Sequence, residues 1–192
     1  MIKNKKQLLE ALKQDARANG RTTIKPYFWG DEIWKFQVVL RKLEYYANMP
    51  RNKRLMFSLP YLFAKLLYHN MSIKLNFSIP INVFAEGLSI PHFGTIVVSN
   101  AATIGKNCRI HEGVTIGATN GSTFAATIGD NVFIASGAKI IGEVKIADNV
   151  AIAANAVVTK SIDEPGTTWG GIPARKISDN SSRSNLNSRL FE

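Results

Sequence analysis

The chain has a single cysteine, Cys108, among its 192 residues. One cysteine cannot form an intramolecular disulfide, so no disulfide framework is expected. The most apolar segment, residues 55–68, is interrupted by Pro60 and Lys65 and is shorter than the roughly 20 residues of a membrane-spanning helix. The N-terminal residues also lack the uninterrupted apolar stretch of a signal peptide. These absences predict a cytoplasmic protein.

Negative charge is scarce as well. The chain has 14 Asp and Glu against 24 Lys and Arg, which gives a formal net charge of +10. A charge of this sign favours anionic partners such as nucleic acid, an acidic membrane surface or a phosphorylated cofactor. Charge alone does not choose among them.

Helical periodicity is confined to the first seventy or so residues. Apolar residues recur at helical spacing over residues 5–18, 31–46 and 53–70, and Pro60 predicts a bend in the last of these. From about residue 76 onward β-branched residues become frequent and helical patterns stop. The sequence therefore predicts a helical cap over residues 1–75, a β domain over 76–177 and a polar, mobile tail over 178–192.

The β domain carries a repeat of six residues. Its aliphatic positions are six residues apart, or once twelve, at Ile104, Ile110, Ile116, Ile128, Ile134, Ile140, Ile146, Ile152 and Val158. Small or medium apolar residues stand two positions earlier, and Gly or Asn, which tolerate tight corners with positive φ, often stand three positions later. This self-similarity is typical of a β-helix, in which stacked rungs bury one continuous column.

The repeat is irregular in two places. Residues 120–125 skip the pattern and predict a loop within residues 118–126 (ATNGSTFAA). Before Ile104 the residues Phe84, Ile90 and Ile96 also repeat at six, but two positions out of phase. We attribute this shift to an insertion near residues 98–101.

Several segments of the β domain resemble the left-handed β-helix acyltransferases, in particular the serine acetyltransferase branch with its O-acetyltransferases of capsular and exopolysaccharide synthesis. The resemblance rests on residues 87–98 (GLSIPHFGTIVV), 114–117 (VTIG), 138–142 (AKIIG) and 170–175 (GGIPAR). It implies a mainly β fold, a left-handed parallel β-helix of hexapeptide repeats with an N-terminal α-helical cap. It also implies a homotrimer with active sites between subunits. The left hand comes from the resemblance, since periodicity does not define it.

Acetyl transfer to an alcohol requires a base, and histidine suits this role because its ordinary pKa lies near neutrality. The resemblance makes His92 that base, acting by direct attack with acetyl-CoA as donor, without an acyl-enzyme and without a metal. His111 follows 19 residues later, one more than three hexapeptides, and the resemblance implies three hexapeptides per coil, which places His111 on the neighbouring coil. It has either a catalytic role, orienting the acceptor or the base, or a structural one. His69 ends the helical cap and is expected to be structural.

The resemblance also implies a binding slot for acetyl-CoA, formed by Gly117, Ala118, Ser136, Ala154, Arg175 and Lys176. The first two match a segment whose backbone amides approach the thioester. The next two match small residues that line the pantetheine slot, and the two cations are candidates for the phosphates. Corner packing explains the four small residues equally well, and a solvated basic tail explains the cations. Cys108 falls in the inward column and is expected to be core and not a nucleophile.

The sequence departs from the serine-specific enzymes in its charged residues. Those enzymes place an aspartate before the catalytic histidine, a second one upstream, and an Arg-His pair in the extended loop. Here Pro91 precedes His92, residues 76–80 hold no carboxylate, and residues 118–126 hold no Arg or His. Asp15, in residues 13–17 (KQDAR), does match a motif of both branches. The group that orients His92 is open among a backbone carbonyl, Glu86, Glu112 and His111.

These departures favour a neutral acceptor hydroxyl over a zwitterionic amino acid. The leading prediction is an O-acetyltransferase that acts on a sugar in surface-polysaccharide synthesis, with peripheral contact to an anionic membrane at its inner face and no nucleic acid partner. Serine O-acetyltransferase of cysteine biosynthesis is the alternative. A metal enzyme of carbonic-anhydrase type would require three converging histidines, and a non-catalytic scaffold would leave residues 87–98 unexplained.

Overall fold

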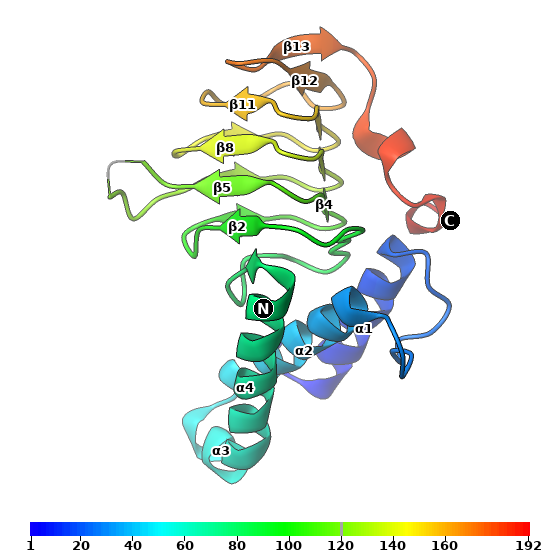
Figure 1. Cartoon of the computed structure of the whole chain (residues 1–192), viewed down its shortest axis with the longest axis vertical. Coiled ribbons are helices and arrows are strands. Elements are labelled where there is room, and N and C mark those ends of the chain that lie inside the picture. The colour runs from blue at the N-terminus through cyan, green and yellow to red at the C-terminus, as the bar shows by residue number, and fades with distance from the viewer. Residues whose placement is uncertain (120) are drawn as a thin grey trace.

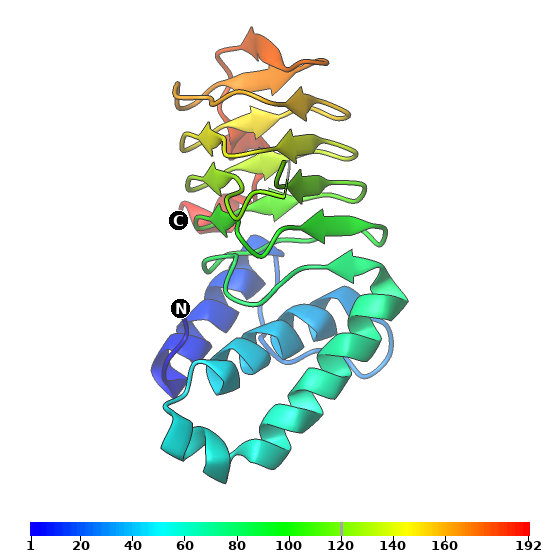
Figure 2. The same ribbon diagram turned by 90° about the vertical axis from the view of Figure 1, so that its left-hand side faces the viewer.

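The computed structural model describes residues 1–119 and 121–192, and shows four helices beneath a stack of short strands (Figures 1 and 2). The helices are α1 (Lys5–Ala18), α2 (Glu32–Ala47), α3 (Arg51–Met56) and α4 (Ser58–Leu75). The first two confirm the helices predicted over residues 5–18 and 31–46. The expected bend at Pro60 is wrong, because the chain breaks at Phe57 instead. Pro60 lies in the first turn of α4, where an amide hydrogen is not required.

The strands form three parallel sheets that wind into a β-helix. One sheet contains β1 (Phe77–Ser78), β2 (Ile96–Val98), β5 (Thr115–Gly117), β8 (Lys139–Ile141) and β11 (Val157–Val158) in that order. The second runs β13 (Arg175–Ser178), β12 (Thr168–Gly170), β10 (Ala151–Ile152), β7 (Phe133–Ile134) and β4 (Arg109–Ile110). The third holds β3 (Thr103–Ile104), β6 (Thr127–Ile128) and β9 (Lys145–Ile146). Only the β12–β13 pair is antiparallel among these strands.

The predicted aliphatic column forms the core. Ile110, Ile134 and Ile152 are completely buried, as is Cys108 to within 1%. The column continues downward into Phe36 of α2. The cap and the β-helix therefore share one hydrophobic core, and each rung is stabilised by its neighbours.

One corner of the coil is built from stacked asparagines. Asn107, Asn131 and Asn149 adopt positive φ of 57°, 56° and 59°. The Asn107 side chain donates to Asn131 at 2.8 Å, and Asn131 donates to Asn149 at 3.2 Å. Asparagine tolerates this left-handed conformation, and the amide ladder satisfies its side chains from coil to coil.

The insertion that shifts the repeat lies at a different corner from the one expected. Ser89 bridges to Arg109, which sets Ile90 level with Ile110, and Val98 pairs with Ile116. Between these levels the first coil takes eight residues where the second takes six. The position expected near residues 98–101 is therefore wrong, because Ile96 and Val98 are both buried and either fits a count of six. The additional residues belong to the corner that carries His92.

The loop predicted within residues 118–126 extends sideways from the coil between β5 and β6 (Figure 1). Asn120, at the start of the expected loop segment 120–125, lies outside the described residues. Thr119 and Ser122 are joined by a backbone hydrogen bond of 2.8 Å. Phe124 is exposed.

The C-terminal tail is packed against the body, which corrects the expectation of a mobile segment. After β13 the chain descends beside the coils and reaches α1 (Figure 1). Ser182 is fully buried, donates its hydroxyl to the Asn131 carbonyl and donates its amide to the Asn149 carbonyl at 3.0 Å. Arg189 donates to the Gly20 carbonyl at 3.0 Å. These polar residues are ordered because they pair with backbone groups that the corners leave free.

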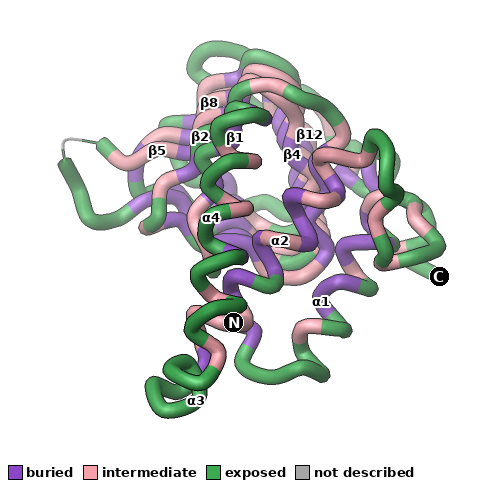
Figure 3. The backbone as a smooth tube through the Cα atoms, turned by 60° about the horizontal axis from the view of Figure 1, so that its bottom comes forward, coloured by how far each residue is buried: buried purple, intermediate pink, exposed green. Residues whose placement is uncertain are grey.

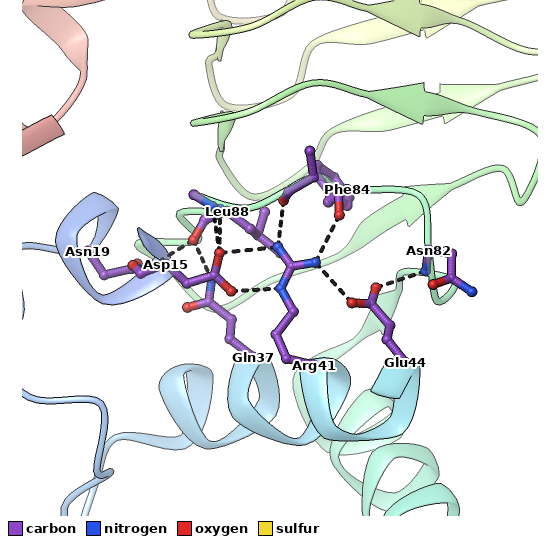
Figure 4. A network of polar contacts seen from close by, with 10 residues as sticks. Asp15, Asn19, Gln37, Arg41, Glu44, Asn82, Phe84 and Leu88 are labelled. Carbon is purple, nitrogen blue, oxygen red and sulfur yellow. Dashed lines mark hydrogen bonds and ion pairs between the residues drawn. The ribbon is translucent and has the colours of Figure 1, made fainter. Parts of the chain in front are cut away.

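A buried guanidinium fastens the cap to the first coil (Figure 4). Arg41 of α2 binds Asp15 of α1 at 2.7 Å and Glu44 at 3.0 Å, and donates to the carbonyls of Phe84 and Ala85. Burial alone would lower the pKa of Arg41, but attraction by the two carboxylates outweighs it and the pKa is raised. Asp15 also accepts from the amides of residues 87 and 88. One ion cluster thus joins α1, α2 and the coil.

The far side of the cap is exposed. The tube in Figure 3 is mostly green along α3 and α4, and large apolar side chains there face outward, namely Leu55, Met56, Leu59, Leu62, Phe63 and Leu66. Within residues 1–119 and 121–192, no helix combines the length and apolar character needed to cross a bilayer.

Replacing Arg41 by methionine tests the fastening of the cap. The substitution leaves Asp15 and Glu44 buried without a counter-charge, so the free energy of unfolding should fall by about 3–5 kcal/mol. Urea unfolding followed by circular dichroism measures this loss. The control is Lys106→Gln, which removes an exposed ion pair with Glu86 (3.0 Å) and should change the free energy by about 1 kcal/mol or less. Equal losses in the two variants would contradict a special role for Arg41.

Candidate functional site

The widened corner with His92 stands at the head of a column of stacked corners. A Cβ added to Gly94 would lie 2.9 Å from the Cβ of Glu112, so residues 92–94 rest directly on residues 111–113. The next corners follow, because the Gly137 amide donates to the Glu112 carbonyl and the Asn155 amide to the Ser136 carbonyl, both at 2.9 Å. The predicted site residues His92, His111, Ser136 and Ala154 therefore share one column.

Three side chains converge at the end of this column nearest the cap, namely those of His92, His111 and Glu112. Their ring nitrogens and carboxylate oxygens lie within 4.8 Å of one another, with one atom taken from each residue. The His92 and His111 rings meet edge to face with centroids 5.4 Å apart, and His111 meets Phe133 in the same way at 5.1 Å. His92 is exposed, whereas the other two are half-buried. The prediction that the two histidines lie on neighbouring coils is confirmed.

Both ring nitrogens of His111 are engaged. Arg109 donates from Nε to His111 Nε2 at 3.3 Å, and His111 Nδ1 lies 3.4 Å from the Ser136 hydroxyl. Since arginine can only donate, Nε2 accepts and Nδ1 carries the proton. Burial, and then the charge of Arg109, lower the pKa of His111. His111 is consequently neutral near pH 7.

Glu112 is ionised in the same environment. The Ser136 hydroxyl and the residue's own amide donate to the carboxylate and lower its pKa, and the two histidines contribute less. The other oxygen, Oε2, is buried and has no hydrogen-bond partner among the described residues. The Glu112 carboxylate thus places one negative charge next to the exposed imidazole of His92. Two histidines and a carboxylate are also ligands of transition metals.

A cleft of about 430 Å³ lies between the cap and the first two coils, next to the corner of His92, although the His92 side chain itself does not line it. Pro91 and Phe93, on either side of His92, line it together with Arg109. The cap contributes Arg21, Asp31, Glu32, Trp34 and Gln37.

The cap side of this cleft is charged and polar. Arg21 and Asp31 form a bidentate ion pair, with both contacts at 2.7 Å. Arg21 Nε and Gln37 Oε1 are buried and lack partners among the described residues. Both residues line the cleft, but these two polar atoms are closed to solvent.

Gly117 and Ala118 are not brought to His92 within one chain. They end and follow β5, whereas the corner of residues 111–113 precedes that strand. At about 3.3 Å per residue the two ends are roughly 15 Å apart. The predicted cofactor segment and the predicted base are thus at opposite edges of the same sheet.

The other predicted residues occupy three different environments. Lys176 is held by Glu164 and Asp179, both at 2.6 Å, so its charge is already paired. Arg175 lines a small cleft together with Lys160 and Trp169. Burial raises the pKa of Cys108 to about 12, which agrees with a core thiol. His69 lies on α4, outside the cluster of His92, so the three histidines do not converge.

The cleft residues of the cap carry no signal in the sequence. Arg21, Asp31 and Gln37 lie more than fifty residues before His92 and belong to no repeat. Arg109 stands two positions before His111, on the other side of the buried Ile110. The hexapeptide register could therefore have placed the Arg109 side chain beside that of His111.

Comparisons with known proteins follow this architecture. Residues 125–160 match the family model of the bacterial transferase hexapeptide (six repeats). A serine acetyltransferase of Staphylococcus epidermidis strain RP62A is 40% identical over 114 residues, which cover 55% of this chain and 53% of that protein. The chain therefore spans about half the length of the curated relative that it matches.

Solved structures extend the likeness into the cap. The serine acetyltransferase of Brucella abortus strain S19 superimposes with a TM-score of 0.71 at 25% identity, covering 93% of this chain and 72% of that one. It has also been solved with coenzyme A. The enzyme of Neisseria gonorrhoeae in complex with serine gives a TM-score of 0.64 at 26% identity, covering 91% and 70%. The fold is that of these hexapeptide-repeat enzymes, with the left-handed winding that the resemblance implied.

The comparisons contradict the predicted sugar acceptor. The relative and the structures are serine acetyltransferases, and they lend no support to a polysaccharide substrate or to membrane contact. The prediction was wrong because it considered charged partners only at Pro91, within residues 76–80 and in the loop of residues 118–126. In the fold, charged side chains reach the cleft from the cap and from β4.

The protonation of His111 can be tested directly. Its pKa is expected below the ordinary value of about 6.5, and Arg109→Gln should raise it, because a positive charge beside the ring is removed. Titration by NMR of protein labelled in its three histidines measures the shift. The resonance of His69 on α4 serves as an internal control that the substitution should leave in place. A His111 curve that does not move would refute the Arg109 contact.

Proposed function

We propose that the chain is an acetyl-CoA-dependent O-acetyltransferase with L-serine as acceptor and His92 as general base. The observation that carries the proposal is the exposed His92 on its widened corner, where the adjacent Pro91 and Phe93 line a cleft that also holds charges of both signs. The likeness to serine acetyltransferases solved with serine and with coenzyme A supports it.

The cleft matches the chemistry of a free amino acid. A zwitterion requires a cation for its carboxylate and an acceptor for its ammonium group. Arg109 supplies the first and Glu32 the second, since Arg21 and Asp31 are already paired with each other. The acceptor would thus be bound between the cap and β4, with its hydroxyl directed to the His92 corner.

His92 would act on protons only. It takes the hydroxyl proton as the serine oxygen attacks the thioester carbonyl carbon, and it returns that proton to the sulfur as the carbon–sulfur bond breaks. The products are O-acetylserine and coenzyme A, and the histidine is regenerated. Small side chains at Ser136 and Ala154 leave room for the pantetheine arm along the column.

The separation of Gly117 and Ala118 from His92 favours a homotrimer. If adjacent subunits pack side by side, the β5 end of one chain faces the His92 corner of the next, and its backbone amides can stabilise the oxyanion. Each active site would then be shared by two chains. Arg175 and Lys160 remain the candidates for the cofactor phosphates, since Lys176 is already paired.

Release of free coenzyme A from acetyl-CoA tests the reaction. L-Serine should stimulate release, and His92→Ala should lower kcat by about 10²- to 10⁴-fold, the usual contribution of a general base. The control is His69→Ala, on the exposed cap helix, which should retain full activity. Turnover that does not depend on L-serine would overturn the acceptor, and full activity of His92→Ala would overturn the mechanism.

The shared site can be tested by mixing inactive subunits. His92→Ala removes the base, and Gly117→Trp blocks the cofactor side, so each variant alone should be inactive. Coexpressed one to one, about a quarter of the interfaces would combine an intact His92 with an intact Gly117, and the same fraction of activity should return. Sedimentation equilibrium should give three times the 21.2 kDa chain mass. A monomer at micromolar concentration, or no recovery on mixing, would contradict the trimer.

A further inference from the structure

A general base of this kind requires an acceptor for the proton on its second ring nitrogen. The carboxylates that orient the histidine in the serine-specific enzymes are missing here, at Pro91 and in residues 76–80. Glu86 is engaged by Lys106 at 3.0 Å and points to solvent. This leaves Glu112 and His111 as side chains close to His92.

Glu112 has the position and the free atom that the role requires. Its corner packs directly against the corner of His92, and one carboxylate oxygen lies within 4.8 Å of one ring nitrogen of each histidine. Its Oε2 is buried and has no hydrogen-bond partner in the part of the chain that the structure describes. His92 is exposed and free to rotate toward it, and hydrogen bonds in catalytic sites often shorten only when substrate binds.

We infer that Glu112 is the positioning residue of His92, accepting a hydrogen bond from one ring nitrogen so that the other faces the acceptor hydroxyl. The inference rests on the proposed function for its catalytic consequence only. A carboxylate in this place also stabilises the imidazolium that forms when His92 takes the proton. In this inference the carboxylate that orients His92 lies on the adjacent coil, at Glu112, and not at Pro91 or within residues 76–80.

His111 is unsuited to the same role because both of its nitrogens are used. Arg109 occupies Nε2, and the Nδ1 proton faces Ser136. The cation at Nε2 also opposes a metal ion at this cluster, since it takes the lone pair that a metal would need. Lys139 is the remaining charged group at the corner, and it donates to the Gly113 carbonyl. Among the described residues, Arg109 and Lys139 are therefore the charged groups that face the Glu112–His92 pair, and His111 is the neutral titratable group beside it.

Kinetics of Glu112→Ala test the catalytic consequence. The substitution should lower kcat about 10²-fold, the lower end of what a general base contributes, with KM for acetyl-CoA unchanged. Loss of the carboxylate should also move the acid limb of the pH profile, which a purely structural role would leave in place. The control is Glu86→Ala, which removes a carboxylate from the first coil and should keep the wild-type kcat. An unchanged kcat in Glu112→Ala would overturn the inference.

The tautomer of His92 gives a readout that needs no activity. With ¹⁵N-labelled histidine, wild-type His92 should show one dominant tautomer, and Glu112→Ala should show a mixture. A changed tautomer without serine turnover would uphold Glu112 and reject only the acceptor. An unchanged tautomer, or zinc bound in stoichiometric amount that Glu112→Ala abolishes, would overturn the positioning role. Should Glu112→Ala fail to fold, Glu112→Gln keeps the volume, removes the charge and should still lower kcat about 10-fold.

Discussion

The attachment of the cap to the coil depends on one buried cation. Arg41 loses its hydration on burial, and the structure offsets that cost with two carboxylates and two backbone carbonyls. The same contacts fix α1 and α2 over the first coil. Because Arg21, Asp31 and Gln37 reach the cleft from this cap, the geometry of the proposed acceptor site depends on the Arg41 cluster.

The residues proposed for catalysis do not lie at the Arg41 cluster but along the column of stacked corners that begins with His92. Each corner places one short segment against the next at the spacing of the coils, so residues about eighteen positions apart become neighbours. Base, proton acceptor and cofactor slot can therefore be built from successive turns of one simple repeat. The two additional residues widen the corner that carries His92, and the His92 side chain is exposed there.

The spacing of the aliphatic residues was sufficient to predict the β-helix and its core, and the resemblance, with three hexapeptides per coil, added the proximity of His92 and His111. The position of the insertion was not predictable, because Ile96 and Val98 satisfy the same count and only the strand pairing separates them. The break at Phe57 was not predictable from Pro60, because the first turn of a helix accepts a proline and Pro60 therefore does not mark the break. The packing of the tail was not predictable from its polar composition, because it depends on hydrogen bonds to the backbone carbonyls of Asn131 and Asn149, which are distant in the sequence.

The two ends of the β-helix differ from its sides. At one end β13 turns back antiparallel on β12, and at the other the helical cap covers the first coil (Figure 2). Among the described residues, the last strand at the β13 end is therefore antiparallel to the ladder that a further coil would have to continue. The proposed homotrimer would use the lateral faces instead, where a rotation can close into a ring of finite size and not into a fibre.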